Sequence, residues 1–139
     1  MPAKRRDVRE SALILTFEKL FRDDPVDEIF EIASETEGVI INGEVKALVK
    51  GIIEKSEEID SIISKFSNKR AVERIPKINL AVLRLAIYEA LYDEKVPINV
   101  AISEAVFLAE KYALDSDVSF VNGVLGSFSR CSEAPENNE

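Results

Sequence analysis

The segment from residue 77 to 93 constrains the fold most, because apolar side chains cover nearly every side of the helix that it predicts. A surface helix has one apolar face, whereas a helix that is apolar all round must be surrounded by other elements. The apolar residues of this segment are Ile78, Leu80, Ala81, Val82, Leu83, Leu85, Ala86, Ile87, Tyr88 and Leu91. We therefore expect this helix at the centre of the fold, with Leu83 and Ile87 buried.

The rest of the chain also spaces its apolar residues as a helix does, and no useful stretch alternates them with the period of a strand. Helices are predicted at about residues 4–22, 26–36, 43–66, 77–93 and 99–112, followed by a last helix with Asp117 as its N-cap. Asp23-Asp24-Pro25, the stretch from Gly38 to Gly43, Pro76 and Pro97 separate them. The predicted fold class is all-α, with six or seven helices and a disordered tail over residues 131–139.

Composition narrows the classes of function. No apolar run reaches the roughly 18 residues of a membrane span, and no signal-peptide cleavage pattern follows the basic start. The lone cysteine, Cys131, excludes a disulfide framework and fits a reducing cytoplasm. The chain has no histidine and no glycine-rich phosphate loop. We therefore expect no catalytic residues, no metal site and no cofactor, although carboxylates and lysines would remain available to an enzyme.

The charge is unevenly distributed in a chain whose formal net charge is -8. From residue 23 to 65 there are twelve acidic residues and four basic ones. Basic residues gather in two places: Lys4, Arg5, Arg6 and Arg9 at the start, and Lys69, Arg70, Arg74, Lys77 and Arg84 further on. Charge alone leaves two interpretations open, a binding surface for an anionic partner or a solvated helix end.

Three motifs in the second half carry a resemblance. They are Pro97-x-x-Val100-x-Ile102-x-Glu104-Ala105-Val106-x-Leu108-Ala109, Phe120-Val121-Asn122-Gly123-Val124-Leu125, and, upstream, Val82-Leu83-Arg84-Leu85-Ala86-x-Tyr88-Glu89. With the N-terminal Arg5-x-x-Val8-Arg9-x-x-Ala12-Leu13, the chain resembles the NusB family of bacterial transcription antitermination factors. The similarity extends from about Arg5 to Phe128.

Several motif residues also have purely structural interpretations. Arg84 and Glu89 suit capping or pairing, and Gly123, which is costly within a helix, suits close helix packing. Phe120 is either a core residue or an exposed stacking platform for RNA bases. The chain also departs from the family, which often has Trp in place of Arg70 and Asp-Arg in place of Asn79-Leu80. Just before the FVNG helix the family has an acid or amide and then Ser, where Ser116 and Asp117 stand here.

The resemblance implies a single domain over residues 1–130, made of two helical subdomains packed roughly perpendicular. They would span about residues 1–66 and 69–130. The family binds the boxA element of ribosomal RNA leaders as a heterodimer with the ribosomal protein NusE, in the transcription elongation complex. The site residues carried over are Lys4, Arg5, Arg6, Arg9, Phe120 and Asn122. A cytoplasmic RNA-binding protein that is not an enzyme follows from this resemblance.

The physics of the N-terminal residues is compatible with that role. On a helix that advances about 100° per residue, Arg5 and Arg9 lie close together, with Arg6 further round. Three exposed guanidiniums on one edge would meet successive phosphates, and a basic partner could dock on the acidic stretch of residues 23–65. The alternative is a helical protein-interaction module, with or without homodimerisation, that has no intrinsic RNA binding.

Overall fold

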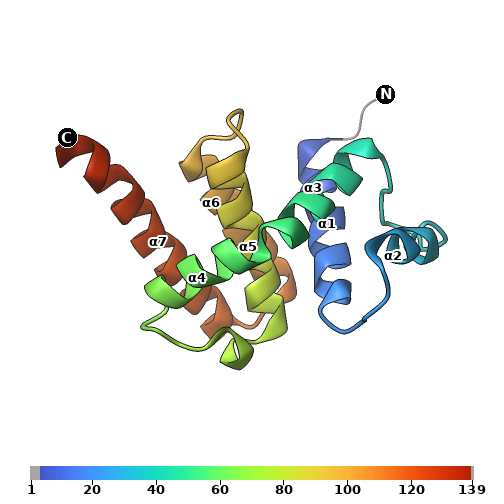
Figure 1. Cartoon of the computed structure of the whole chain (residues 1–139), viewed down its shortest axis with the longest axis horizontal. Helices are drawn as coiled ribbons and strands as arrows, with labels where there is room; N and C mark the ends of the chain where they lie inside the picture. Colours follow the sequence, from blue (N-terminus) through green and yellow to red (C-terminus); the bar gives the residue numbers. More distant parts are fainter. Residues whose placement is uncertain (1–3, 139) are drawn as a thin grey trace. The chain divides into compact units, whose positions relative to one another are not determined.

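The structure is a computed structural model that describes residues 4–138, with side chains up to Cys131. In this part of the chain there are seven α-helices, one short 3-10 helix and no strand, which confirms the all-α prediction (Figure 1). The chain divides into two compact units, Met1–Lys55 and Ser56–Glu139. Each unit is described by itself.

The first unit contains α1 (Arg5–Lys19), α2 (Val26–Ala33) and α3 (Gly43–Glu54), and α1 packs against both of the others. The apolar faces meet in a core formed by Val8, Ala12, Leu13, Leu15, Ile29, Phe30, Ala33, Val45, Leu48, Val49 and Ile52. The side chain of Asn42 caps α3 by accepting a hydrogen bond from the backbone N–H of Val45 at 2.8 Å. The hydroxyl of Ser11 on α1 accepts another from the backbone of Ile40 at 2.9 Å, which ties the preceding loop to α1.

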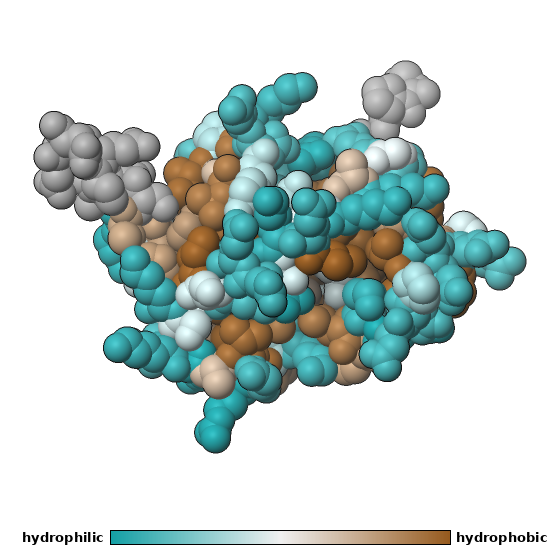
Figure 2. Space-filling view, in the orientation of Figure 1, coloured by the Kyte–Doolittle hydropathy of each residue, from teal (hydrophilic) through white to brown (hydrophobic). Residues whose placement is uncertain are grey.

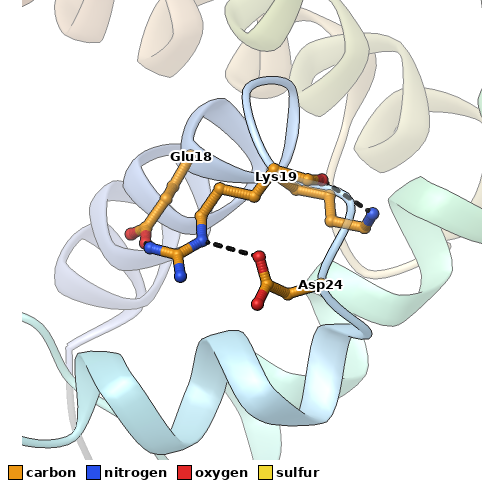
Figure 3. Close-up of polar contacts among 4 residues, drawn as sticks. Glu18, Lys19 and Asp24 are labelled. Carbon is orange, nitrogen blue, oxygen red and sulfur yellow. Dashed lines mark hydrogen bonds and ion pairs between the residues drawn. The ribbon is translucent and has the colours of Figure 1, made fainter.

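The turn between α1 and α2 is stabilised by polar contacts of Arg22 with Glu18, Lys19 and Asp24, the three residues labelled in Figure 3. The Arg22 side chain donates through Nε to Asp24 at 3.0 Å and through Nη1 to Glu18 at 3.3 Å, and Lys19 Nζ donates to the Arg22 carbonyl at 3.2 Å. The hydrogen bond from Arg22 lowers the pKa of the Asp24 carboxyl below its usual range. These contacts stabilise the chain reversal at the Asp23-Asp24-Pro25 break, where the sequence predicts the end of the first helix.

The predicted long helix over residues 43–66 is wrong, because it is two helices. The first unit ends with α3 at Glu54, and the second begins with α4 (Ser56–Phe66) after the single residue Lys55. Each helix has its own partner: α3 packs on α1, and α4 packs on helices of the second unit. The break therefore follows from packing, and no proline or glycine at residue 55 marks it.

The second unit is built around α5 (Lys77–Tyr92), which contacts α4, α6 (Ile98–Tyr112) and α7 (Asp115–Asn138) (Figure 1). A short 3-10 helix, Val72–Arg74, lies between α4 and α5. The buried apolar residues of α5 are Leu80, Ala81, Val82, Leu83, Leu85, Ala86 and Ile87. They point in all directions around the helix, so the predicted central position of this segment is confirmed, as is the burial of Leu83 and Ile87.

Arg84 joins α5 to α4, as the structural interpretation predicted. Its Nε and Nη2 donate to the two carboxylate oxygens of Asp60 at 2.8 and 2.6 Å, in the two-pronged geometry that suits a guanidinium. A second link between the same helices is the hydroxyl of Tyr92, which donates to Glu58 at 2.6 Å. Glu89 is buried among the apolar residues of α5.

The last helix begins earlier than predicted. Asp117 is not its N-cap, because α7 starts at Asp115 and the N–H groups of Asp117 and Val118 bond to the carbonyl of Leu114. The Asp117 side chain instead accepts a hydrogen bond from the amide nitrogen of Asn79 at 3.1 Å. Asn79 is only 1% exposed, and its own amide oxygen has no hydrogen-bond partner. Two of the departures from the family pattern therefore meet in one contact.

This contact predicts that substitutions at residues 79 and 117 have coupled effects on the stability of the protein. A family-like acid at residue 79 and Ser at residue 117 would also form a donor–acceptor pair, with the roles exchanged. Asn79→Asp alone should destabilise the protein by about 1–3 kcal/mol, since it removes the buried donor and brings two carboxylates together. Adding Asp117→Ser should recover most of that loss in urea unfolding. Equal stability of the single and double variants would show that the contact does not couple these positions.

The α7 backbone is helical to Asn138, past Cys131, where the predicted tail begins. The side chains of residues 132–139 lie outside the described residues, as does residue 139 altogether. The disordered tail stays a prediction.

Candidate nucleic-acid interface

The first candidate site is the basic start of α1. Lys4 and Arg6 are exposed and Arg5 is half-buried, so three cations reach the surface within three residues. The guanidinium of Arg5 forms an ion pair with Glu44 of α3 at 2.7 Å. An exposed pair of this kind is worth about 1 kcal/mol or less, so an RNA phosphate can compete for Arg5.

Arg9 does not belong to this exposed group, although the sequence placed it there. Only 6% of the residue is accessible to solvent, so the expectation of three exposed guanidiniums on one helix edge is wrong for Arg9. The residues three, four and seven positions later, Ala12, Leu13 and Thr16, are buried as well. Because such positions share one side of a helix, Arg9 lies on the inward side of α1.

The second pair of candidate residues, Phe120 and Asn122, lies on α7. Being two positions apart, they lie about 160° from each other around the helix axis and face different sides. Asn122 is exposed and Phe120 is half-buried, so the ring is neither a full core residue nor a free platform. The guanidinium carbon of Arg70 lies 4.8 Å from the centre of the Phe120 ring. At this distance the cation and the ring attract each other.

Phe120 and Arg70 line a groove of about 830 Å³ in the second unit. One wall is the segment that follows α4, and the other is α7. The lining residues are Phe66, Ser67, Asn68, Lys69, Arg70, Ala71, Arg74, Ser119, Phe120, Gly123, Val124 and Ser127. Three of them are cations and none is an acid, in a protein with a net charge of -8. We call this cavity the basic groove.

The segment that follows α4 turns sharply because two consecutive residues, Asn68 and Lys69, have a φ of 60°. Asparagine tolerates this left-handed conformation better than lysine does. The turn is fixed by hydrogen bonds to the end of α4, from the Lys69 N–H to the carbonyl of Ser64 at 2.9 Å and from the Ser67 hydroxyl to the same carbonyl at 3.3 Å. The backbone therefore holds the basic residues of this wall in a defined position.

The sequence suggests that Gly123 allows close packing of α7 against another helix, but the structure shows no such packing at this position. A Cβ atom built on it would meet no atom within 4 Å, so the position is open. Gly123 lines the basic groove, and its missing side chain enlarges the cavity.

Lys69, Arg70 and Arg74 were missing from the sequence-based site. The sequence showed them as a second basic stretch, but it offered no reason to associate them with Phe120, which lies about one third of the chain further on. Only the packing of the segment after α4 beside α7 brings them together.

Two further features of the described residues bear on function. No group of three or more His, Cys, Asp or Glu side chains in residues 4–131 is arranged to hold a metal ion. None of the described helices has the length and hydropathy needed to cross a bilayer. The face seen in Figure 2 is largely hydrophilic, with separate hydrophobic patches between the polar side chains.

Comparison with known proteins shows similarity along almost the whole chain. The chain is 38% identical to the transcription antitermination protein NusB of Ruminiclostridium cellulolyticum over 128 residues, which cover 91% of this chain and 88% of that protein. It is 38% identical to NusB of Bacillus subtilis over 124 residues, covering 89% and 93%.

Solved structures agree with the sequence matches. T. maritima NusB superposes with a TM-score of 0.81 at 30% identity, covering 94% of this chain and 93% of that chain. A chain from a crystal structure of the antitermination factors NusB and NusE with double-stranded RNA superposes with a TM-score of 0.80 at 26% identity, covering 91% and 96%. The model of the NusB family matches residues 6–130, and this chain therefore belongs to the NusB family.

Proposed function

We propose that this protein is a transcription antitermination factor that binds the boxA RNA of ribosomal RNA leaders together with the ribosomal protein NusE. The relatives that cover most of the chain are named as transcription antitermination proteins, and a similar structure contains NusE and RNA. The chain covers about nine-tenths of those relatives, so the comparison concerns whole proteins.

The observation that carries the proposal is the exposed basic start of α1 on an otherwise acidic protein. Lys4, Arg5 and Arg6 reach the surface, and Arg5 and Arg6 stand at positions of the family's RNA-binding motif. Single-stranded RNA offers one phosphate per nucleotide, and each cation that neutralises a phosphate releases condensed counterions. Arginine adds planar donors that fit phosphate and stack on unpaired bases. Phe120 and Asn122 are proposed as further RNA contacts on α7.

A heterodimer makes physical sense for such a small patch. Three cations on a protein of net charge -8 should bind RNA weakly, because the rest of the surface repels the phosphates. A basic partner extends the RNA-binding surface and is attracted to the acidic residues between positions 23 and 65. NusE is the proposed partner, and the RNA then joins the two proteins.

We further propose that the protein acts without catalysis, in the cytoplasm, as part of the transcription elongation complex. Bacterial RNA polymerase and its nascent transcripts are found there. In this role the protein needs binding surfaces and no reactive group, cofactor or metal.

The experiment that tests this function measures terminator read-through. A template carries boxA upstream of an intrinsic terminator, and a matched template carries a scrambled boxA. With NusE present in a reconstituted transcription reaction, adding the protein should increase read-through on the boxA template only. Equal read-through on both templates would contradict the proposal.

One observation favours a second candidate, a protein-interaction module that forms a homodimer. The outward side of α6 exposes Val100 and Phe107, one heptad apart, and Leu114 follows the helix with 72% of its surface exposed. An apolar stripe of this kind is suited to covering by another protein surface. Light scattering and an RNA titration test this alternative: a dimer that Phe107→Glu converts to a monomer, in a protein that does not bind boxA RNA, would favour it.

A further inference from the structure

We propose that the basic groove of the second unit holds one unpaired nucleotide of the bound RNA, with its base beside Arg70 and Phe120 and its phosphates beside Lys69 and Arg74. This inference rests on the proposed RNA-binding function and goes beyond it. It assigns a cavity and three cations that the N-terminal motif does not include.

The shape of the groove supports an inserted ligand. Ser119, Gly123 and Ser127 follow one another at intervals of four residues, so they form one side of α7. All three side chains are small or absent, and nothing lies within 4 Å of the space that a Cβ on Gly123 would occupy. The volume, about 830 Å³, falls within the range of about 300–1,000 Å³ that is typical of small-molecule sites.

The charge of the groove selects an anion. Lys69, Arg70 and Arg74 line it and no carboxylate does. The chain as a whole has a net charge of -8, so a cavity lined by three cations and no acid differs from the average of the protein. Guanidinium groups bind phosphate oxygens through paired N–H donors, and a lysine ammonium adds a point charge. The hydroxyl groups of Ser119 and Ser127 provide neutral donors and acceptors for a sugar or a base edge.

The aromatic contact selects a nucleotide over a simple phosphate. Arg70 lies 4.8 Å from the Phe120 ring centre, so the two planar groups are already paired. Single-stranded RNA recognition uses such surfaces, because an unstacked base gains a new partner on an aromatic ring or a guanidinium plane. Pairing Arg70 with Phe120 beforehand also reduces the side-chain entropy lost on binding.

The position of Gly123 allows a steric test that spares the core. A Cβ atom at this position meets no neighbour, so Gly123→Ala should add only a methyl group there, whereas Gly123→Leu should project a larger side chain into the groove that Gly123 lines. Both variants should melt at or above the temperature of the parent protein, because glycine is the weaker helix former. Titration of labelled boxA RNA, with NusE present, should show about a tenfold or greater loss of affinity for Gly123→Leu. Gly123→Ala should bind within about twofold of the parent.

A second pair of variants tests the chemistry. Arg70→Ala should weaken RNA binding, and Arg70→Lys should recover only part of the loss, because lysine keeps the charge without the stacking plane.

If Gly123→Leu binds boxA like the parent while replacement of Lys4, Arg5 and Arg6 weakens binding, the groove is not an RNA site and the proposed function stands. If Gly123→Leu instead weakens NusE binding in the absence of RNA, the groove holds a protein segment and this inference is overturned. A parent protein that does not distinguish boxA from scrambled RNA refutes the proposed function itself.

Discussion

Leu83→Ala should lower the free energy of unfolding by about 2–5 kcal/mol, because it leaves a cavity in the middle of the second unit. Leu83 is fully buried on α5, the helix that contacts α4, α6 and α7. Surrounding helices on several sides limit how far the structure can collapse into the space. Urea unfolding followed by circular dichroism measures the change directly.

The matched control is Val100→Ala on the exposed side of α6, which removes two methyl groups from a side chain that is 39% exposed. Its effect should stay near 0.5 kcal/mol or below. If Leu83→Ala costs no more than this control, α5 is not the centre of its unit and the architecture described above is incorrect.

The second large effect concerns RNA and salt. Replacing Lys4, Arg5 and Arg6 together by Ala should reduce the slope of log K against log salt by about 2, if each cation neutralises one phosphate of a single strand. Arg9 is left unchanged, because its burial would mix a loss of stability with the loss of binding. The melting temperature should therefore remain close to that of the parent. The measurement is a titration of boxA RNA with the protein and NusE at several salt concentrations.

Phe120→Ala provides the contrast, since a stacking ring carries no charge. This variant should lose about 1–3 kcal/mol of binding free energy while the salt slope stays nearly constant. If the variant that lacks Lys4, Arg5 and Arg6 has the same slope of log K against log salt as the parent, these residues form only a solvated helix end and do not bind RNA. RNA contacts would then come from the basic groove or from the partner.

The sequence predicted the fold class and the central helix because both depend on local periodicity. The apolar residues around α5 have no polar face between them, and only a buried helix satisfies that pattern. The break at Lys55 was missed because no residue there is a helix breaker. It arises from the different packing partners of α3 and α4, and sequence periodicity carries no information about partners.

The residues of the candidate site were predicted only where local sequence patterns determine their exposure. The exposure of Lys4 and Arg6 follows from their position at the start of a helix. The sequence contains a signal for the burial of Arg9, because the apolar residues Ala12 and Leu13 share its side of the helix, although the charge of Arg9 in the arginine motif favours an exposed position. The contact of Asn79 with Asp117 spans 38 residues, and the approach of Arg70 to Phe120 joins the segment after α4 to α7. Neither pairing has a local pattern that reveals it.

The most direct test of the account is a titration of labelled boxA RNA and a scrambled control, each with and without NusE. We predict weak binding by the protein alone, and much tighter binding with NusE that is selective for boxA. If the protein binds boxA RNA and the scrambled RNA with the same affinity, both with and without NusE, this result would contradict the central claim that this chain recognises boxA RNA as one half of a heterodimer.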